Sequence, residues 1–115
     1  MTVAVQFRLR LYRDATIAIG PGKVALLEAI AETGSISAAA KRFDMSYRRA
    51  WLLVDEMNRA LAAPAVAASA GGAHGGGTRL TDVGEEIVRR YRAVESIARQ
   101  AAASEIEELG RLIAP

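Results

Sequence analysis

The stretch of sequence that decides the fold is residues 35–62, SISAAAKRFDMSYRRAWLLVDEMNRALA. Its first part predicts a short helix, because Ser35 or Ser37 can cap a helix and the alanines at 38–40 favour one. Residues 44–46 predict a tight turn, and the serine that ends this turn is suited to cap a second helix reaching about residue 62. The stretch therefore predicts two helices that cross closely where their side chains are small.

The second helix has one apolar face. Ala50, Val54, Met57 and Leu61 are spaced by four, three and four residues, which places them on one side of a helix. This stripe is expected to pack on the first helix. The side chains near the start of the second helix that lie outside the stripe are left for other contacts, and they are Ser46, Tyr47, Arg48, Arg49 and Trp51.

The residues before this stretch predict a strand and a helix. Apolar and polar side chains alternate from Val3 to Leu11, and a period of two indicates a strand with one buried face. Residues 14–22, with Gly20-Pro21-Gly22, predict a connection into a helix over 23–33. Gly34 is suited to end that helix in a left-handed conformation.

The residues after it predict a hairpin and a last helix. Residues 65–80 hold two short arms around a glycine-rich tip, which is typical of a hairpin. Asp82 and Glu85 suit the start of a helix over about 82–103. A narrow heptad-like seam on this helix predicts contact with a second copy of the chain, through Ile87, Tyr91, Val94 and Ala98. We expect a short tail to follow.

The order of elements predicts a fold that is mostly α with a small β part, a winged helix-turn-helix with a long C-terminal dimerisation helix. Residues 1–80 form the predicted DNA-binding domain, with the helix-turn-helix at 35–62 and the wing at 65–80, and residues 81–115 form the assembly helix and tail. In such a fold the start of the second helix enters the DNA major groove. The residues expected to contact double-stranded DNA are Ser35, Ser37, Ser46, Tyr47, Arg48, Arg49 and Trp51, with His74 and Arg79 on the wing; the roles of Arg48 and Arg49 could be exchanged.

Composition excludes several other classes of function. The chain has no cysteine and one histidine, so we expect no metal site, no cofactor and no enzyme. The glycine-rich segment lacks the Lys-Ser or Lys-Thr pair that a phosphate-binding P-loop needs. No apolar run is long enough to span a membrane and the start does not resemble a signal peptide, so we expect a cytoplasmic protein. The basic excess lies before residue 81, and residues 81–115 carry an acidic excess.

Several runs of residues resemble the N-terminal domain of the ModE family, the molybdate-responsive transcriptional regulators. They are the run at 34–40, Ser46-Tyr47-Arg48 with Ala50-Trp51, Glu56-Met57-Asn58, the polyglycine wing, and Leu80-Thr81 with Gly84. The first part of the match is shared with LysR-type DNA-binding domains. The resemblance implies a winged helix, a homodimer held by the first and last helices, and a palindromic operator.

One difference from the ModE family concerns the ligand. Regulators of this family that sense molybdate carry C-terminal oxyanion-binding domains, and the chain ends at Pro115. We therefore expect a stand-alone DNA-binding domain that binds no small molecule itself. The sequence leaves repression and activation equally open. The alternative hypothesis is a winged-helix protein-interaction module, or an accessory subunit, without direct reading of DNA.

Overall fold

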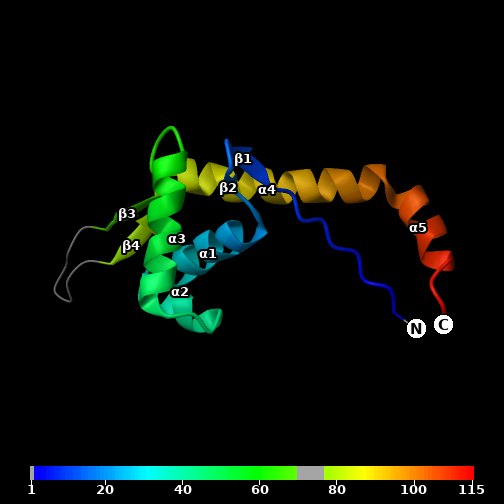
Figure 1. Cartoon of the computed structure of the whole chain (residues 1–115), viewed down its shortest axis with the longest axis horizontal. Helices are drawn as coiled ribbons and strands as arrows, with labels where there is room; N and C mark the ends of the chain where they lie inside the picture. The colour runs from blue at the N-terminus through cyan, green and yellow to red at the C-terminus, as the bar shows by residue number, and fades with distance from the viewer. Residues whose placement is uncertain (1, 70–76) are drawn as a thin grey trace.

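The structure is a computed structural model that describes residues 2–69 and 77–115. It is mostly helical with two separate two-stranded sheets, which confirms the predicted fold class (Figure 1). Within the described residues, no helix is both long and apolar enough to cross a membrane. The elements in order are β1 (Leu11–Arg13), β2 (Thr16–Ile19), α1 (Pro21–Thr33), α2 (Ile36–Arg42), α3 (Tyr47–Ala60), β3 (Val66–Ala68), β4 (Thr78–Leu80), α4 (Asp82–Ala101) and α5 (Ala103–Arg111).

The core is centred on α1, which packs against α2, α3, α4 and β4. Its largest fully buried side chains come mainly from α1. Where α2 and α3 meet, Ala39, Ala40 and Ala50 are almost completely buried. Their small side chains let the two helix backbones approach closely, as the sequence predicted. Between the two helices Asp44 has a φ of 51°, a conformation that an aspartate tolerates better than most residues.

The prediction of a strand over residues 3–11 is wrong for most of its length. Residues 2–10 form no strand, and β1 begins only at Leu11, pairing antiparallel with β2 inside the stretch predicted as a connection. The extended segment 2–10 instead passes α4 near β1 and, toward its start, diverges from α4 and approaches the end of α5 (Figure 1). Tyr91 Oη donates to the carbonyl of Leu9 at 3.0 Å, and Arg99 donates to the carbonyl of Val5 at 3.3 Å. A helix, rather than a neighbouring strand, covers one side of this segment.

The two arms of the predicted hairpin are confirmed as β3 and β4. They pair antiparallel, with Val66 opposite Leu80 and Ala68 opposite Thr78. The amide of Ser69 donates to the carbonyl of Gly77 at 2.9 Å, which extends the pairing by one step. The predicted glycine-rich tip and His74 lie outside the described residues.

The C-terminal part contains two helices where one helix and a short tail were predicted. α4 ends at Ala101, and α5 follows after a single residue. Figure 1 shows α4 extending well beyond the other helices before the chain turns into α5. The prediction of a short tail is wrong, since Ala103–Arg111 form a helix. The spacing of Ile106 and Leu109 and the presence of Glu105 in the first turn favour this further amphipathic helix.

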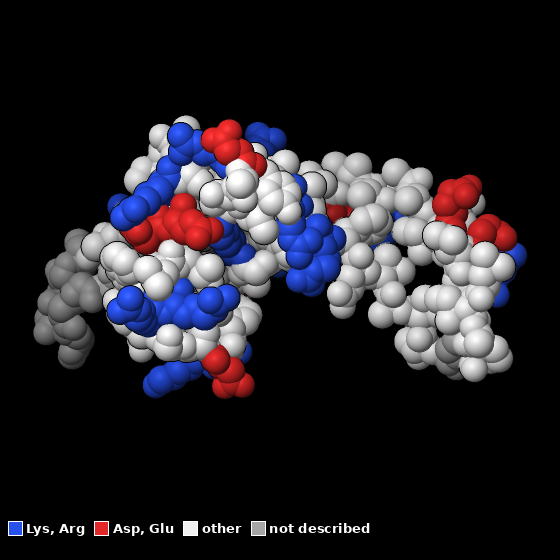
Figure 2. Space-filling view, in the orientation of Figure 1, with Lys and Arg blue, Asp and Glu red and all other residues white. Residues whose placement is uncertain are grey.

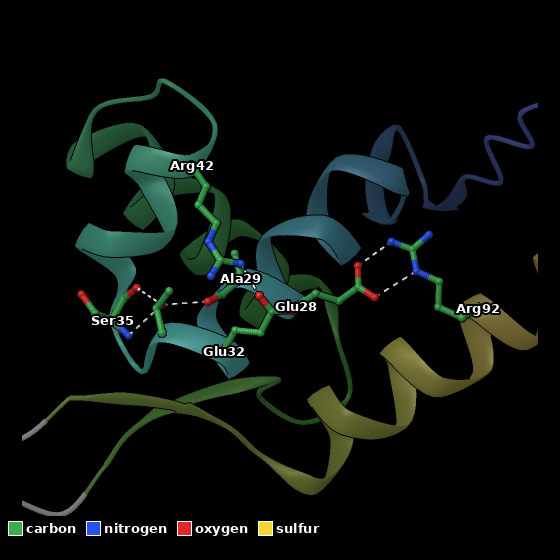
Figure 3. A network of polar contacts seen from close by, with 7 residues as sticks. Glu28, Ala29, Glu32, Ser35, Arg42 and Arg92 are labelled. Carbon is green, nitrogen blue, oxygen red and sulfur yellow. Dashed lines mark hydrogen bonds and ion pairs between the residues drawn. The ribbon is translucent and has the colours of Figure 1, made fainter.

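Ion pairs fix α1 to its neighbours on two sides (Figure 3). Glu28 of α1 accepts a hydrogen bond from Nε of Arg92 in α4 at 3.0 Å, and a second one from the same guanidinium. One turn along, Glu32 pairs with Arg42 of α2. α1 therefore links the long helix to the helix-turn-helix.

Candidate nucleic-acid interface

Two serine caps set the starts of α2 and α3. Ser35 Oγ accepts a hydrogen bond from the amide of Ala38 at 3.1 Å, and Ser46 Oγ accepts one from the amide of Arg49 at 3.1 Å. Each hydroxyl still has its own hydrogen to donate, as a phosphate contact requires. The third predicted serine, Ser37, is exposed in the first turn of α2.

The outermost face of α3 carries Arg48. The buried stripe of this helix is Ala50, Val54 and Met57, as predicted. Helical periodicity places Arg48 and Leu52 on the opposite side. Arg48 is exposed and has no ion-pair or hydrogen-bond partner among the described residues, and the side chain of Leu52 is 47% exposed. This face is where α3 protrudes furthest from its own core.

A second face of α3 points toward the wing. Tyr47 and Trp51 lie four residues apart on it and are 56% and 46% exposed. Further along the same face, Asn58 binds the first strand of the wing. Its Oδ1 accepts from the amide of Ala65 at 2.9 Å, and its Nδ2 donates to the carbonyl of Val66 at 3.2 Å. The asparagine thus sets the position of the wing relative to α3.

A third face of α3 points to the opposite flank, toward the start of α1. It carries Arg49, which is exposed, and Glu56, which forms an ion pair with Lys23 of α1 at 2.6 Å. Lys23 is only 7% exposed, and it also donates to the carbonyl of Ile17 in β2. This buried lysine joins α1, β2 and α3 at one point.

Free positive charge on α3 is confined to its first half. Arg59, near the end of the helix, pairs with Asp55 at 3.0 Å. Arg48 and Arg49 form no such pair with any residue that the structure describes. Figure 2 shows basic side chains gathered over the N-terminal end of α3, with acidic side chains above them. The arginines of α3 that lack an acidic partner among the described residues therefore lie at the start of the helix.

The base of the wing is held against the turn between α1 and α2. The amide of Thr78 donates to the carbonyl of Gly34 at 2.9 Å. Gly77 passes so close that a Cβ added there would lie 2.6 Å from the same oxygen. Arg79 is exposed in β4, and the only hydrogen bond of its side chain within the described residues is a long one, 3.4 Å, to the carbonyl of Leu80. The arginine is thus held at a fixed place with its charge uncompensated.

The four predicted dimer residues differ in their surroundings. Ile87 packs against the core of the chain. Tyr91 is 3% exposed, and burial, followed by the charge of Glu95, raises the pKa of its hydroxyl. Val94 is 44% exposed, and Ala98 is half-buried. Among the large hydrophobic side chains of α4, the most exposed is one that the seam omitted, Ile97, at 64%.

Sequence reasoning missed two residues that position the interface. Lys23 was assigned no role, although a lysine beside the apolar residues of α1 was a signal for a buried ion pair. Asn58 was noted only as part of a motif and proves to bind the wing. Among residues 2–69 and 77–115, no three His, Asp or Glu side chains gather as metal ligands would.

Comparison with known proteins identifies the family. The model of the bacterial regulatory helix-turn-helix protein, lysR family, matches residues 22–85, which span α1 through the start of α4. The chain belongs to this family. The matched region includes both flanks of α3 described above.

Curated proteins similar to this chain include two that are named ModE and one that is named MopB. The chain is 45% identical over 101 residues to the molybdenum transport protein ModE of Azotobacter vinelandii, covering 88% of this chain and 37% of that protein. It is 51% identical over 78 residues to the molybdenum-pterin-binding protein MopB of Rhodobacter capsulatus, covering 68% and 29%. It is 37% identical over 81 residues to the DNA-binding transcriptional dual regulator ModE of Escherichia coli K12, covering 70% and 31%. The resemblance to ModE is confirmed, and the chain spans about a third of the length of these relatives.

Proposed function

We propose that this chain binds double-stranded DNA in a sequence-specific manner and regulates transcription, with α3 in the major groove. The observation that carries the proposal is the start of α3, where Tyr47, Arg48 and Arg49 are exposed on a helix whose other side is buried. An arginine can donate two hydrogen bonds to the edge of a guanine, or pair with a phosphate.

The flanks of α3 support the same proposal. Ser35, Ser37 and Ser46 stand at the starts of the two helices, where hydroxyl groups commonly bind phosphates. Arg79 stands at the base of the wing with its charge uncompensated. Residues 1–80 would form the DNA-binding unit and residues 81–115 the assembly unit. One relative carries DNA binding in its name, which supports the proposal that this chain binds DNA.

We also infer that two copies of the chain bind together. Val94 and Ile97 are exposed apolar side chains in the second half of α4. A symmetric pair would present two α3 helices, and its operator would be an inverted repeat with half-sites about one turn of DNA apart. Binding to the chromosome would place the protein in the cytoplasm, and the proposed role is regulation rather than catalysis.

The decisive experiment is selection of bound sequences from random duplex DNA. We expect an enriched motif arranged as an inverted repeat, and binding that weakens steeply as salt increases. Arg48→Ala serves as a matched variant that should lose the enrichment. If no sequence is enriched and duplex DNA does not bind at low salt, the proposal is wrong and a protein-interaction module is the better reading.

The names of two relatives refer to molybdenum, and this property is not transferred to the chain. We propose that residues 1–115 alone bind no small molecule specifically. Calorimetric titration of the chain with molybdate is the test, and a saturable heat at one ion per chain would contradict it.

A further inference from the structure

The outer face of the extended segment 2–10 carries two arginines. Val5, Phe7 and Leu9 are half-buried, whereas Arg8 and Arg10 are exposed. Successive side chains of an extended chain point to opposite sides, and the partial burial of Phe7 and Leu9 agrees with an outward direction for Arg8 and Arg10. The alternation in the sequence therefore serves to present two arginines on one side of the segment.

These two arginines lie near the face of α3 that carries Arg49 and Glu56. Arg8 and Arg10 line one open hollow together with Arg49, Lys23 and Glu56, and its volume is about 620 Å³. The segment and α3 are far apart in the sequence, so the hollow is a product of the fold. Figure 2 shows a second group of basic side chains where the segment passes the start of α1.

The positive charge of the hollow is largely uncompensated. Lys23 and Glu56 neutralise each other in their ion pair. Arg8, Arg10 and Arg49 have no ion pair and no side-chain hydrogen bond with any residue of 2–69 or 77–115. Three guanidinium groups that share one hollow repel each other, and an anion would relieve that repulsion. The hollow thus favours a phosphate or a similar group.

The position of the hollow favours the DNA backbone over a dissolved anion. It lies on the flank of α3 away from Asn58 and the wing. A helix in the major groove has one sugar-phosphate backbone on each side, and the groove is about 12 Å wide. The wing would reach one backbone, and the hollow faces the other. Arg8 and Arg10 are separated by about 6.6 Å along an extended chain, which is a step of the same order as that between neighbouring phosphates of a strand.

We infer that Arg8, Arg10 and Arg49 form a second backbone-binding site, which holds phosphates of the DNA strand on the side of α3 opposite the wing. This inference rests on the proposed DNA binding and assigns the extended N-terminal segment a role in it. The site contributes affinity and orientation but no sequence preference, because phosphates are the same in every sequence.

The test measures binding to the selected operator and to a scrambled duplex across a salt series. Arg8→Ala and Arg10→Ala should each weaken binding to both duplexes by the same factor. Each should reduce the slope of log affinity against log salt by about 0.9, and the double variant by about twice that. Arg8→Lys and Arg10→Lys should keep the slope, since they keep the charge.

The matched control is Arg111→Ala, which also removes one positive charge but lies in α5 and is paired with Glu107 and Glu108. It should leave the slope unchanged. If the wild-type chain binds DNA and loses preference with Arg48→Ala, but the Arg8 and Arg10 variants keep the full slope, this inference fails while the proposed function stands. Tight one-to-one binding of inorganic phosphate that these variants abolish, with DNA binding unaltered, would also overturn it.

Discussion

At the scale of single residues, two adjacent arginines of α3 point in different directions and would face different parts of a bound duplex. Arg48 lies opposite the buried stripe, where α3 would penetrate furthest into a groove. Arg49 is turned toward the hollow that it shares with Arg8 and Arg10. The sequence alone could not separate the two, because they differ only by one step of helix rotation. The packing of α3 on α1 shows which side of α3 faces away from the rest of the chain. Arg48 lies on that side, which favours it for reading bases.

Replacing Arg48 should therefore affect preference, whereas replacing Arg79 should not. A good bidentate contact to a base discriminates by about 1–3 kcal/mol, so Arg48→Ala should weaken the operator by that amount and flatten preference at one base pair per half-site. Arg79→Ala should weaken all sequences alike and lower the salt slope by about 1. Anisotropy titrations with operator and scrambled duplex measure both. An equal loss on the two duplexes for Arg48→Ala would make it a phosphate contact.

Tyr91 gives the molecule a pH dependence at alkaline pH. Burial raises the pKa of its hydroxyl above the ordinary value of 10.0, and the neighbouring charge of Glu95 acts in the same direction. The neutral form, which donates to Leu9, is favoured by folding. Its contribution to stability is therefore complete below about pH 10 and is lost as the pH rises through the higher pKa of the folded state.

The measurement is the free energy of unfolding of the wild type and of Tyr91→Phe from neutral to alkaline pH. The difference between the two proteins should shrink above about pH 10, because ionisation removes the donor that the variant already lacks. A difference that stays constant from neutral to strongly alkaline pH would contradict the prediction.

At the scale of elements, the helix-turn-helix could be read from the sequence and the N-terminal segment could not. The serine caps, the alanine crossing and the apolar stripe of α3 are local patterns that specify local structure. The alternation over residues 3–11 indicates only an extended chain with one covered side. It does not say whether a strand or a helix covers that side, and here α4 does so. The ion pair of Lys23 with Glu56 joins residues far apart in the sequence, which local patterns do not reveal.

The wing should lose its fixed position when Asn58 is replaced. Asn58→Ala removes the acceptor of the buried Ala65 amide, and an unsatisfied buried donor costs about 1–3 kcal/mol. We expect a lower midpoint of thermal unfolding and weaker binding to all DNA sequences. Asn58→Asp keeps the acceptor and loses only the donor to Val66, so its loss should be smaller. Equal stabilities of the wild type and Asn58→Ala would show that the wing is held by other contacts.

At the scale of the whole molecule, α4 joins the proposed DNA-binding head, which comprises residues 1–80, to the proposed assembly region. Glu28 and Arg92 fix it to α1, and Tyr91 fixes the extended segment to it, so the hollow and α3 share one frame with the long helix. Beyond Tyr91 the apolar side chains of α4 turn outward. The heptad-like spacing predicted only approximately where the apolar side chains of α4 change from buried to exposed. The sequence does not show that the segment 2–10 covers part of the same helix.

The exposed apolar side chains of α4 lead to a prediction about assembly. Val94→Glu and Ile97→Glu should convert a dimer into monomers, because a charge placed in an apolar contact must be buried without a partner. Tyr91 is not a suitable site for this test, because its burial within the chain means that a charge there would also unfold the head. Sedimentation velocity at micromolar concentration measures the state, and thermal unfolding verifies that the monomers remain folded. The matched control is Arg90→Glu on the same helix, an exposed residue paired with Glu86.

The monomeric variants should bind a single half-site with nearly unchanged affinity and lose the added affinity of the inverted repeat. A wild-type chain that sediments as a monomer, both alone and on its operator, would contradict the assembly and with it the expected symmetry of the operator.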